Sequence, residues 1–130
     1  MRKADHVAIA VKDLEGAIRV YRDLLGLEFA GREVVVEQGV EVAFFDLEGL
    51  KLELITPLGE ESPISKFLEK RGGGFHHICF QVENLERELH RLEAKGLRPI
   101  SSEPGAGSRG RKVGFLHPKG TFGALVELIE

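Results

Sequence analysis

The sequence of 130 residues contains no tryptophan and a single cysteine, Cys79. One cysteine excludes a disulfide within the chain, which fits a reducing compartment, and we expect a cytoplasmic protein. Long hydrophobic runs are also missing, so we expect no membrane association. The opening MRKADHVAIAVKD has too short an apolar stretch for a signal peptide, because charge resumes at Lys12. The formal net charge of −3 argues against a protein that binds nucleic acid.

Two stretches of the sequence match each other residue by residue. DHVAIAVKDLEGAIRVYRDLLGLEF aligns with HHICFQVENLERELHRLEAKGLRPI, so that His6 falls on His77. LKLELI aligns with ALVELI, which places Glu53 on Glu127. A duplication of this kind predicts two copies of one folding unit.

Each copy reads as a strand, a helix and three more strands. Alternating apolar residues predict first strands at 6–11 and 77–82. Asp13 and Asn84 are good helix N-caps, and apolar residues follow at spacings of three and four. The remaining strands are expected at 33–37, 40–47, 50–55, 98–101, 112–116 and 123–129.

The fold predicted from this pattern is α+β, with two tandem βαβββ modules. We expect them to form a cupped eight-stranded mixed sheet around one metal site, with the helices outside. Residues 1–130 are expected to be a single domain, because their number and their 42% hydrophobic content suit one core. Module one spans about 1–58, a linker helix about 61–71 and module two about 75–130.

Two adjacent histidines follow a run of three glycines in GGGFHHICFQV. Neighbouring residues of a strand point to opposite faces, so only one of the two is expected to face the cup. The repeat selects His77, which shares the face of His6, and leaves His76 on the other side. Glu53 and Glu127 likewise face away from the apolar neighbours that flank them.

The four duplicated residues suit a metal site. Imidazole nitrogen and carboxylate oxygen together are typical ligands of borderline divalent ions. A buried carboxylate between apolar neighbours is costly unless a cation compensates its charge, and here the arrangement occurs twice. We therefore expect one divalent ion held by His6, Glu53, His77 and Glu127, with His76 outside the set.

At these motifs the sequence resembles the vicinal oxygen chelate superfamily and, within it, the methylmalonyl-CoA epimerases. DHVAIAV and the paired modules are general to the superfamily. The stretches LELITPLGEESPISKFLEKRGGGFHHICFQVENL and VGFLHPKGTFGALVELIE are more specific and look less like glyoxalases. The resemblance implies interconversion of (R)- and (S)-methylmalonyl-CoA, a CoA thioester, by proton abstraction and return at C2 through a metal-stabilised enolate. It also implies a homodimer.

By position, the metal ligands of this family fall on the same four residues. The resemblance implies cobalt, with manganese, zinc or nickel as substitutes. Proton transfer needs an acid–base group on each face of C2, and Glu127 and Glu53 are the first candidates. Lys119 and Arg109 are candidate contacts for the substrate's carboxylate or its CoA phosphates.

The resemblance also implies a further base, because some of these epimerases have a glutamate on the strand after EQGV. In this sequence Val42 occupies that position. Glu41 stands one residue early, and such an offset turns a side chain to the opposite face unless a bulge intervenes. Glu41 is therefore a third candidate base, expected to contribute little.

Three other functions are considered beside the epimerase. A glyoxalase I-type lactoylglutathione lyase, with the same scaffold and ligand types, is the main alternative. An extradiol dioxygenase would hold iron through two histidines and one carboxylate, and the fourth ligand argues against it. A metal-free antibiotic-binding module would have no use for these four residues.

Overall fold

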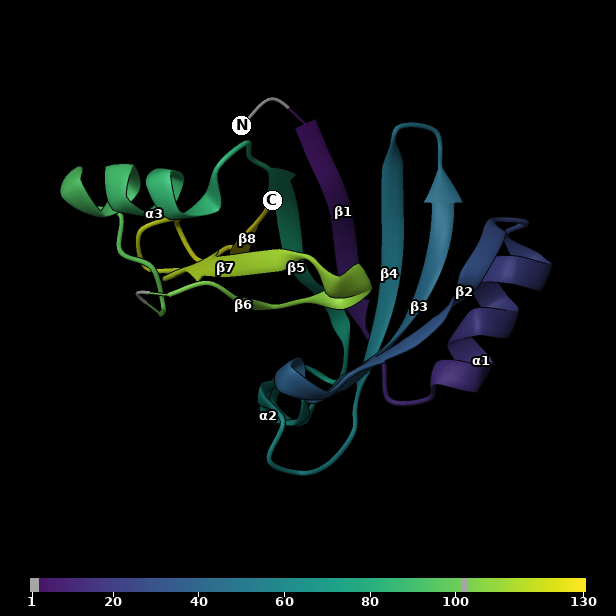
Figure 1. Ribbon diagram of the computed structural model, residues 1–130. Helices are drawn as coiled ribbons and strands as arrows, with labels where there is room; N and C mark the ends of the chain where they lie inside the picture. The colour runs from purple at the N-terminus through teal and green to yellow at the C-terminus, as the bar shows by residue number, and fades with distance from the viewer. Residues whose placement is uncertain (1–2, 102) are drawn as a thin grey trace.

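The computed structural model describes residues 3–101 and 103–130. Within them, eight strands form one mixed sheet in the order β2-β3-β4-β1-β5-β8-β7-β6 (Figure 1). The central pair β1 and β5 is antiparallel, while β1 with β4 and β5 with β8 are parallel. The expected α+β fold of two βαβββ modules is confirmed. The strands are β1 (Lys3–Ala10), β2 (Glu28–Val35), β3 (Val40–Leu47), β4 (Leu50–Pro57), β5 (Gly74–Gln81), β6 (Gly105–Ala106), β7 (Lys112–Leu116) and β8 (Val126–Ile129).

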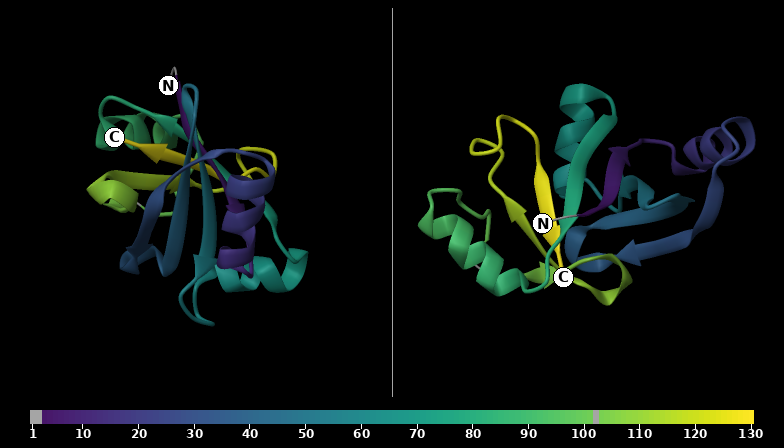
Figure 2. Two further views of the ribbon diagram at one scale, coloured as in Figure 1. Left: turned by 90° about the vertical axis from the view of Figure 1, so that its right-hand side faces the viewer. Right: turned by 90° about the horizontal axis from the view of Figure 1, so that it is seen from above.

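The sheet curls into a cup, and the helices lie outside it (Figures 1 and 2). α1 (Leu14–Arg19) covers the outer face of the first module, and α3 (Leu85–Ala94) covers that of the second. α2 (Pro63–Arg71) lies between the two modules in the chain and closes the lower end of the cup in Figure 1.

The helix ends follow from local hydrogen bonds. The Asp13 side chain accepts from the Gly16 N–H at 3.0 Å, and Asn84 accepts from the Arg87 N–H at 3.0 Å. Such caps satisfy N–H groups that have no partner within the helix. α1 continues as a π-helical turn, η1 (Val20–Leu24), and a 3-10 turn, η2 (Val36–Gln38), follows β2.

Apolar side chains pack on both faces of the sheet. Leu54 and Phe45 are fully buried beneath α1, and Leu85 and Leu89 of α3 pack with Leu128 in the matching cluster of the second module. A third cluster on the inner face joins the floor of the cup to α2. Its members are Ala8, Ala10, Val35, Val40, Val42, Phe44, Ile55, Ile64 and Leu68.

Three expected strands are placed differently. The strand expected at 98–101 is reduced to an isolated bridge between Pro99 and Leu116, because proline has no N–H for a ladder. The two-residue β6 takes its place at the edge of the sheet. β8 begins at Val126 and not at 123, since Phe122 and Gly123 have left-handed backbone angles, with φ of 59° and 92°. The strand expected at 33–37 is shifted to Glu28–Val35.

The rims of the two modules meet across the cup. The backbone N–H of Arg109 donates to the Glu33 carboxylate at 2.9 Å, and that of Ala106 donates to Glu37 Oε2 at 3.3 Å. These bonds join β6 and the loop after it to β2 and to the turn η2. None of the helices described is long and apolar enough to span a membrane.

Candidate metal centre

A cavity of about 390 Å³ lies on the inner face of the sheet. Its volume is within the range of small-molecule sites, and apolar walls surround a small polar centre. The four residues selected by the repeat all line it. The full lining is His6, Glu37, Gln38, Val40, Glu53, Ile55, Pro63, Ile64, His76, His77, Ile100, Ser108, Phe115, Leu125 and Glu127.

Strand register brings the polar centre together. His6 on β1 lies opposite Cys79 on β5, and Cys79 lies beside Glu127 on β8. Two residues further along β1, and so on the same face, Ala8 lies opposite His77 and beside Glu53 on β4. Residues on neighbouring strands at one rung point to the same face. The two glutamates therefore flank the two histidines, one from each side.

Three of the four expected ligands converge on one point. The Nε2 atoms of His6 and His77 lie 3.1 Å apart. Glu127 Oε1 lies 2.9 Å from His6 Nε2 and 3.2 Å from His77 Nε2. Glu53 stands beside this group, with its Oε2 atom 3.4 Å from His6 Nδ1. All four side chains are at most 8% exposed.

The donor set fits a divalent cation. One nitrogen of His6, one of His77 and one oxygen of Glu127 all lie within 4.8 Å of one another. Among the described residues, Glu53 Oε2 and Glu127 Oε1 are the buried side-chain atoms without a hydrogen bond. Unpartnered carboxylate oxygens in a buried site are costly, and a cation would compensate them. Glu53 lies outside this group of three, with its Oε2 atom beside His6 Nδ1.

The placement of His76 corrects the prediction from alternation. Between β1 and β5 the register shifts twice, once between Ala4 and His6 and once between Ala8 and Ile9. His76 is the extra residue of the second shift, and it lines the cavity together with His77. A bulge adds one residue to a strand and so breaks the rule that neighbours face oppositely. His76 nevertheless stays outside the group of three converging ligands.

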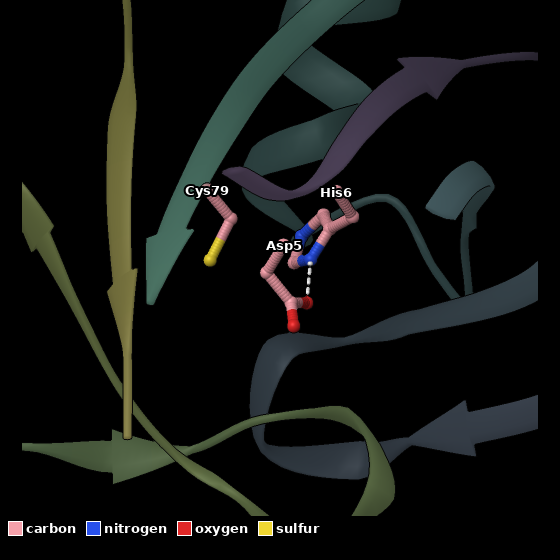
Figure 3. A group of neighbouring side chains, drawn as sticks. All are labelled: Asp5, His6 and Cys79. Atoms are coloured by element: carbon pink, nitrogen blue, oxygen red, sulfur yellow. Dashed lines mark hydrogen bonds and ion pairs between the residues drawn. The ribbon is translucent and has the colours of Figure 1, made fainter. Parts of the chain in front are cut away.

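The first register shift explains the position of Asp5, a residue that the sequence analysis did not select. Asp5 is the extra residue of that shift, and it turns to the same side as His6. Its Oδ2 atom accepts from His6 Nδ1 at 2.8 Å (Figure 3). This bond, together with Arg109 and Arg111, holds the pKa of Asp5 well below its ordinary value.

The buried charges of the centre shift one another's protonation. Burial alone would lower the pKa of His6, but Asp5, Glu127 and Glu53 raise it to about 9. Burial raises the pKa of Glu53. Burial also acts to raise that of Glu127, yet the two imidazoles beside it lower the value to about 2. In the metal-free protein, a charged His6 is thus the internal cation that the carboxylates share.

Cys79 lies at the base of this centre. Its side chain is fully buried, and its sulfur points toward the side of the sheet that carries Asp5 and His6 (Figure 3). It packs with Val113 and Ile129. Burial strongly raises the pKa of the Cys79 thiol, which keeps it in the neutral form.

The loop between β6 and β7 fixes Asp5 from the other side. Arg109 and Arg111 donate to Asp5 at 2.9 Å and 3.0 Å. The Arg109 guanidinium also lies 4.0 Å from Glu53 Oε2 and above the Phe44 ring. Arg109, expected to contact substrate, is thus engaged within the protein. Ser108, which no sequence signal singled out, is buried and lines the cavity.

Two further candidates lie away from the cavity. Glu41 pairs with Arg32 at 3.0 Å, while its neighbour Val42 is buried in the cluster on the inner face. No bulge lies at this part of β3, whose pairing with β4 is regular from Val40 to Leu47. Lys119 is exposed in the turn before β8 and does not line the cavity.

The chain is similar to known proteins over nearly its whole length. The family model "Glyoxalase/Bleomycin resistance protein/Dioxygenase superfamily" matches residues 5–115. An ethylmalonyl-CoA/methylmalonyl-CoA epimerase of Cereibacter sphaeroides is 48% identical, over 97% of this chain and 96% of that protein. The mitochondrial methylmalonyl-CoA epimerase of Homo sapiens is 45% identical, over 97% of this chain and 72% of its own length.

Solved structures of methylmalonyl-CoA epimerases superpose on this chain. A methylmalonyl-CoA epimerase in complex with methylmalonyl-CoA and NH4+ superposes with a TM-score of 0.93 at 36% identity, covering 98% of this chain and 92% of that one. A lactoylglutathione lyase of Schizosaccharomyces pombe is more distant, at 30% identity over 73% of this chain and 37% of that protein. The chain therefore belongs to the glyoxalase/bleomycin resistance protein/dioxygenase superfamily and, within it, to the family of the methylmalonyl-CoA epimerases.

Proposed function

We propose that the protein interconverts (R)- and (S)-methylmalonyl-CoA by removing the C2 proton and returning it on the opposite face. One observation carries the proposal. Two buried carboxylates lie against two histidines in a cavity of a chain that is 45–48% identical to named epimerases. The cavity of about 390 Å³ suits the malonyl end of the substrate, with the CoA portion extending outside.

His6, His77 and Glu127 would hold a divalent ion, with Glu53 as the fourth ligand. Such an ion would supply the positive charge that stabilises the enolate formed when C2 loses its proton. The family resemblance favours cobalt, and manganese, zinc or nickel also suit imidazole and carboxylate ligands. The separation of His6 Nε2 and His77 Nε2 by 3.1 Å supports a shared cation at this point.

Glu53 and Glu127 are the proposed acid–base pair. They come from β4 and β8, on either side of the strands that carry the histidines. This arrangement offers one carboxylate for each face of C2, as epimerisation requires. Burial raises the pKa of Glu53, so its Oε2 atom is suited to hold the proton that C2 releases. Glu41 has no part in this proposal, since it is paired with Arg32.

The apolar wall of the cavity would bind the methyl group and exclude water. Ile55, Ile64 and Leu125 line the cavity beside the polar centre. Water competes for carboxylates and protons, so its exclusion strengthens the electrostatic interactions inside. Ser108 lies on the same surface and is positioned for a polar contact with the substrate.

Deuterium exchange tests the reaction directly. Cobalt-loaded protein is mixed with (S)-methylmalonyl-CoA in deuterated water, and C2 deuteration and the appearance of the (R) form are followed by NMR and by a stereospecific coupled assay. We expect both to require the loaded protein. A parallel sample receives the methylglyoxal–glutathione hemithioacetal. Turnover of that compound without exchange at C2 would support the lyase and overturn the epimerase.

We further infer a homodimer, on the family resemblance. The sheet ends at the edge strands β2 and β6, and a second copy of the chain can cover part of such an edge. Light scattering at micromolar concentration is expected to give twice the chain mass of 14.4 kDa. A mass of one chain would contradict this assembly.

A further inference from the structure

His76 contacts a proposed metal ligand through a single short interaction. Its Nδ1 atom lies 2.9 Å from the Nδ1 atom of His77. Because the bulge turns both rings into the cavity, this contact is made inside the site and not across the sheet. Two ring nitrogens at this distance share one proton, so one ring donates and the other accepts.

The direction of that bond decides whether His77 can bind a cation. His77 Nε2 faces His6 Nε2 at 3.1 Å and Glu127 Oε1 at 3.2 Å. A ligating nitrogen must present its lone pair, so the proton of a neutral His77 ring has to lie on Nδ1. The Nδ1–H group then needs an acceptor within a largely buried site.

The other histidine of the centre has the same arrangement. His6 donates from Nδ1 to Asp5 at 2.8 Å and turns Nε2 toward the shared point. Each histidine therefore has a partner for Nδ1 that leaves Nε2 free for the ion. Asp5 and His76 are also the extra residues of the two bulges in the same strand pair. Partners of this kind fix the tautomer and the orientation of metal-binding imidazoles.

Packing holds the His76 ring in the accepting position. The ring of Phe67, from α2, meets it edge to face, with 5.0 Å between centroids and 85° between planes. His77 is held in the same way by Phe115, at 5.6 Å and 88°. Each ring therefore has an aromatic neighbour that restrains its orientation where the two Nδ1 atoms meet.

We propose that His76 is a positioning residue that accepts the Nδ1 proton of His77 and so keeps His77 Nε2 available for the divalent ion. This inference rests on the metal centre of the proposed function. It predicts that removal of the acceptor lowers the affinity for the divalent ion by about 10- to 100-fold, although all the ligands remain.

Two substitutions separate the acceptor from the bulk of the ring. His76→Asn places an amide oxygen where Nδ1 stands, whereas His76→Phe keeps a ring against Phe67 but has no acceptor. Co²⁺ affinity is measured by calorimetry for both, with His90→Ala as a control at an exposed position on α3. We expect the Asn variant and the control to bind within about threefold of the wild type, and the Phe variant to bind about 10- to 100-fold more weakly.

A second readout examines the tautomer in the metal-free protein. Nitrogen-15 shifts of the neutral His77 ring are expected to place its proton on Nδ1 in the wild type and in His76→Asn. In His76→Phe the Nε2-protonated form should become populated. A purely structural role of His76 would leave this population unchanged, provided that the variant remains folded by circular dichroism.

The possible outcomes distinguish the two proposals. Equal Co²⁺ affinity in the wild type and His76→Phe would overturn the role of His76 and leave the epimerase intact. A His76→Asn variant as weak as His76→Phe would do the same. A wild-type protein that binds no divalent ion would overturn the metal centre itself, and with it the inference.

Discussion

The Nε2 atoms of His6 and His77 lie 3.1 Å apart, although 71 positions separate the two residues in the chain. Each nitrogen is also within 3.2 Å of the same oxygen of Glu127. The three atoms belong to β1, β5 and β8, which are neighbours in the sheet. A cation at this point would be bound by residues of both modules.

Loss of His77 should therefore remove most of the ion. His77→Ala deletes one of the converging donors and leaves Glu127 with one imidazole neighbour. We expect Co²⁺ affinity to fall by more than the loss of about 10- to 100-fold expected when only a supporting partner is removed. Metal content after gel filtration measures the difference. A His77→Ala protein that keeps a full equivalent of Co²⁺ would contradict the assignment.

Asp5 should support His6 in the same manner as His76 supports His77. Asp5→Asn keeps the size of the side chain but weakens the acceptor of the Nδ1 proton and the pairing with Arg109 and Arg111. We expect Co²⁺ affinity to fall by about 10- to 100-fold. Asp46→Asn, which breaks a surface pair with Lys51, is the matched control and should leave affinity unchanged. An unchanged Asp5→Asn protein would show that Asp5 serves the loop alone.

The acid–base assignment predicts unequal effects of two glutamate substitutions. Glu127→Gln, assayed at saturating Co²⁺, should lose about 10²- to 10⁴-fold in kcat because a proton-transfer group is missing. Glu41→Gln should lose less than about tenfold, since this side chain is paired with Arg32 and its strand carries no bulge. Full recovery of Glu127→Gln with added metal, together with an inactive Glu41→Gln, would reverse the assignment.

Metal binding should release a proton at neutral pH. The pKa of His6 is raised to about 9 in the metal-free protein, where Asp5, Glu53, Glu127 and His77 surround it. Below that pH the ring is protonated and the proton competes with the ion, so apparent affinity should increase as pH rises, by about tenfold per unit between 7 and 8.5.

Calorimetry in buffers of different ionisation enthalpy measures this release. Close to one proton per ion is expected at pH 7, and less above pH 9. The His90→Ala protein should give the same value, because that side chain is exposed on α3. A constant affinity across this range, with no buffer dependence, would show that His6 is already neutral before the ion binds.

The two modules should unfold together. Phe45 is fully buried beneath α1, and Leu89 on the buried face of α3 is 2% exposed, so either truncation to alanine should cost about 2–5 kcal/mol. Because one sheet continues through both modules, we expect a single domain in which each variant shifts the same thermal transition. Two separate transitions by calorimetry, with each variant affecting one, would contradict a single cooperative domain.

The sequence was sufficient to find the four proposed ligands. Duplication placed His6 on His77 and Glu53 on Glu127, and all four line one cavity. It failed for Asp5 and His76, because alternation assumes a strand without interruption and the bulges depend on pairing between distant segments. Ser108 was beyond the same reasoning, and so was the pairing of Arg109 with Asp5, since both result from a loop that folds across the other module.

The order in which the strands leave the ribosome has a consequence for this centre. β1 is made first and carries His6, whereas β8 carries Glu127 and is the last strand of the described chain. The converging donor set therefore cannot exist on a nascent chain that lacks its C-terminal segment. A divalent ion bound by these donors would therefore stabilise a chain that has all three strands in place, and not a fragment that lacks β8.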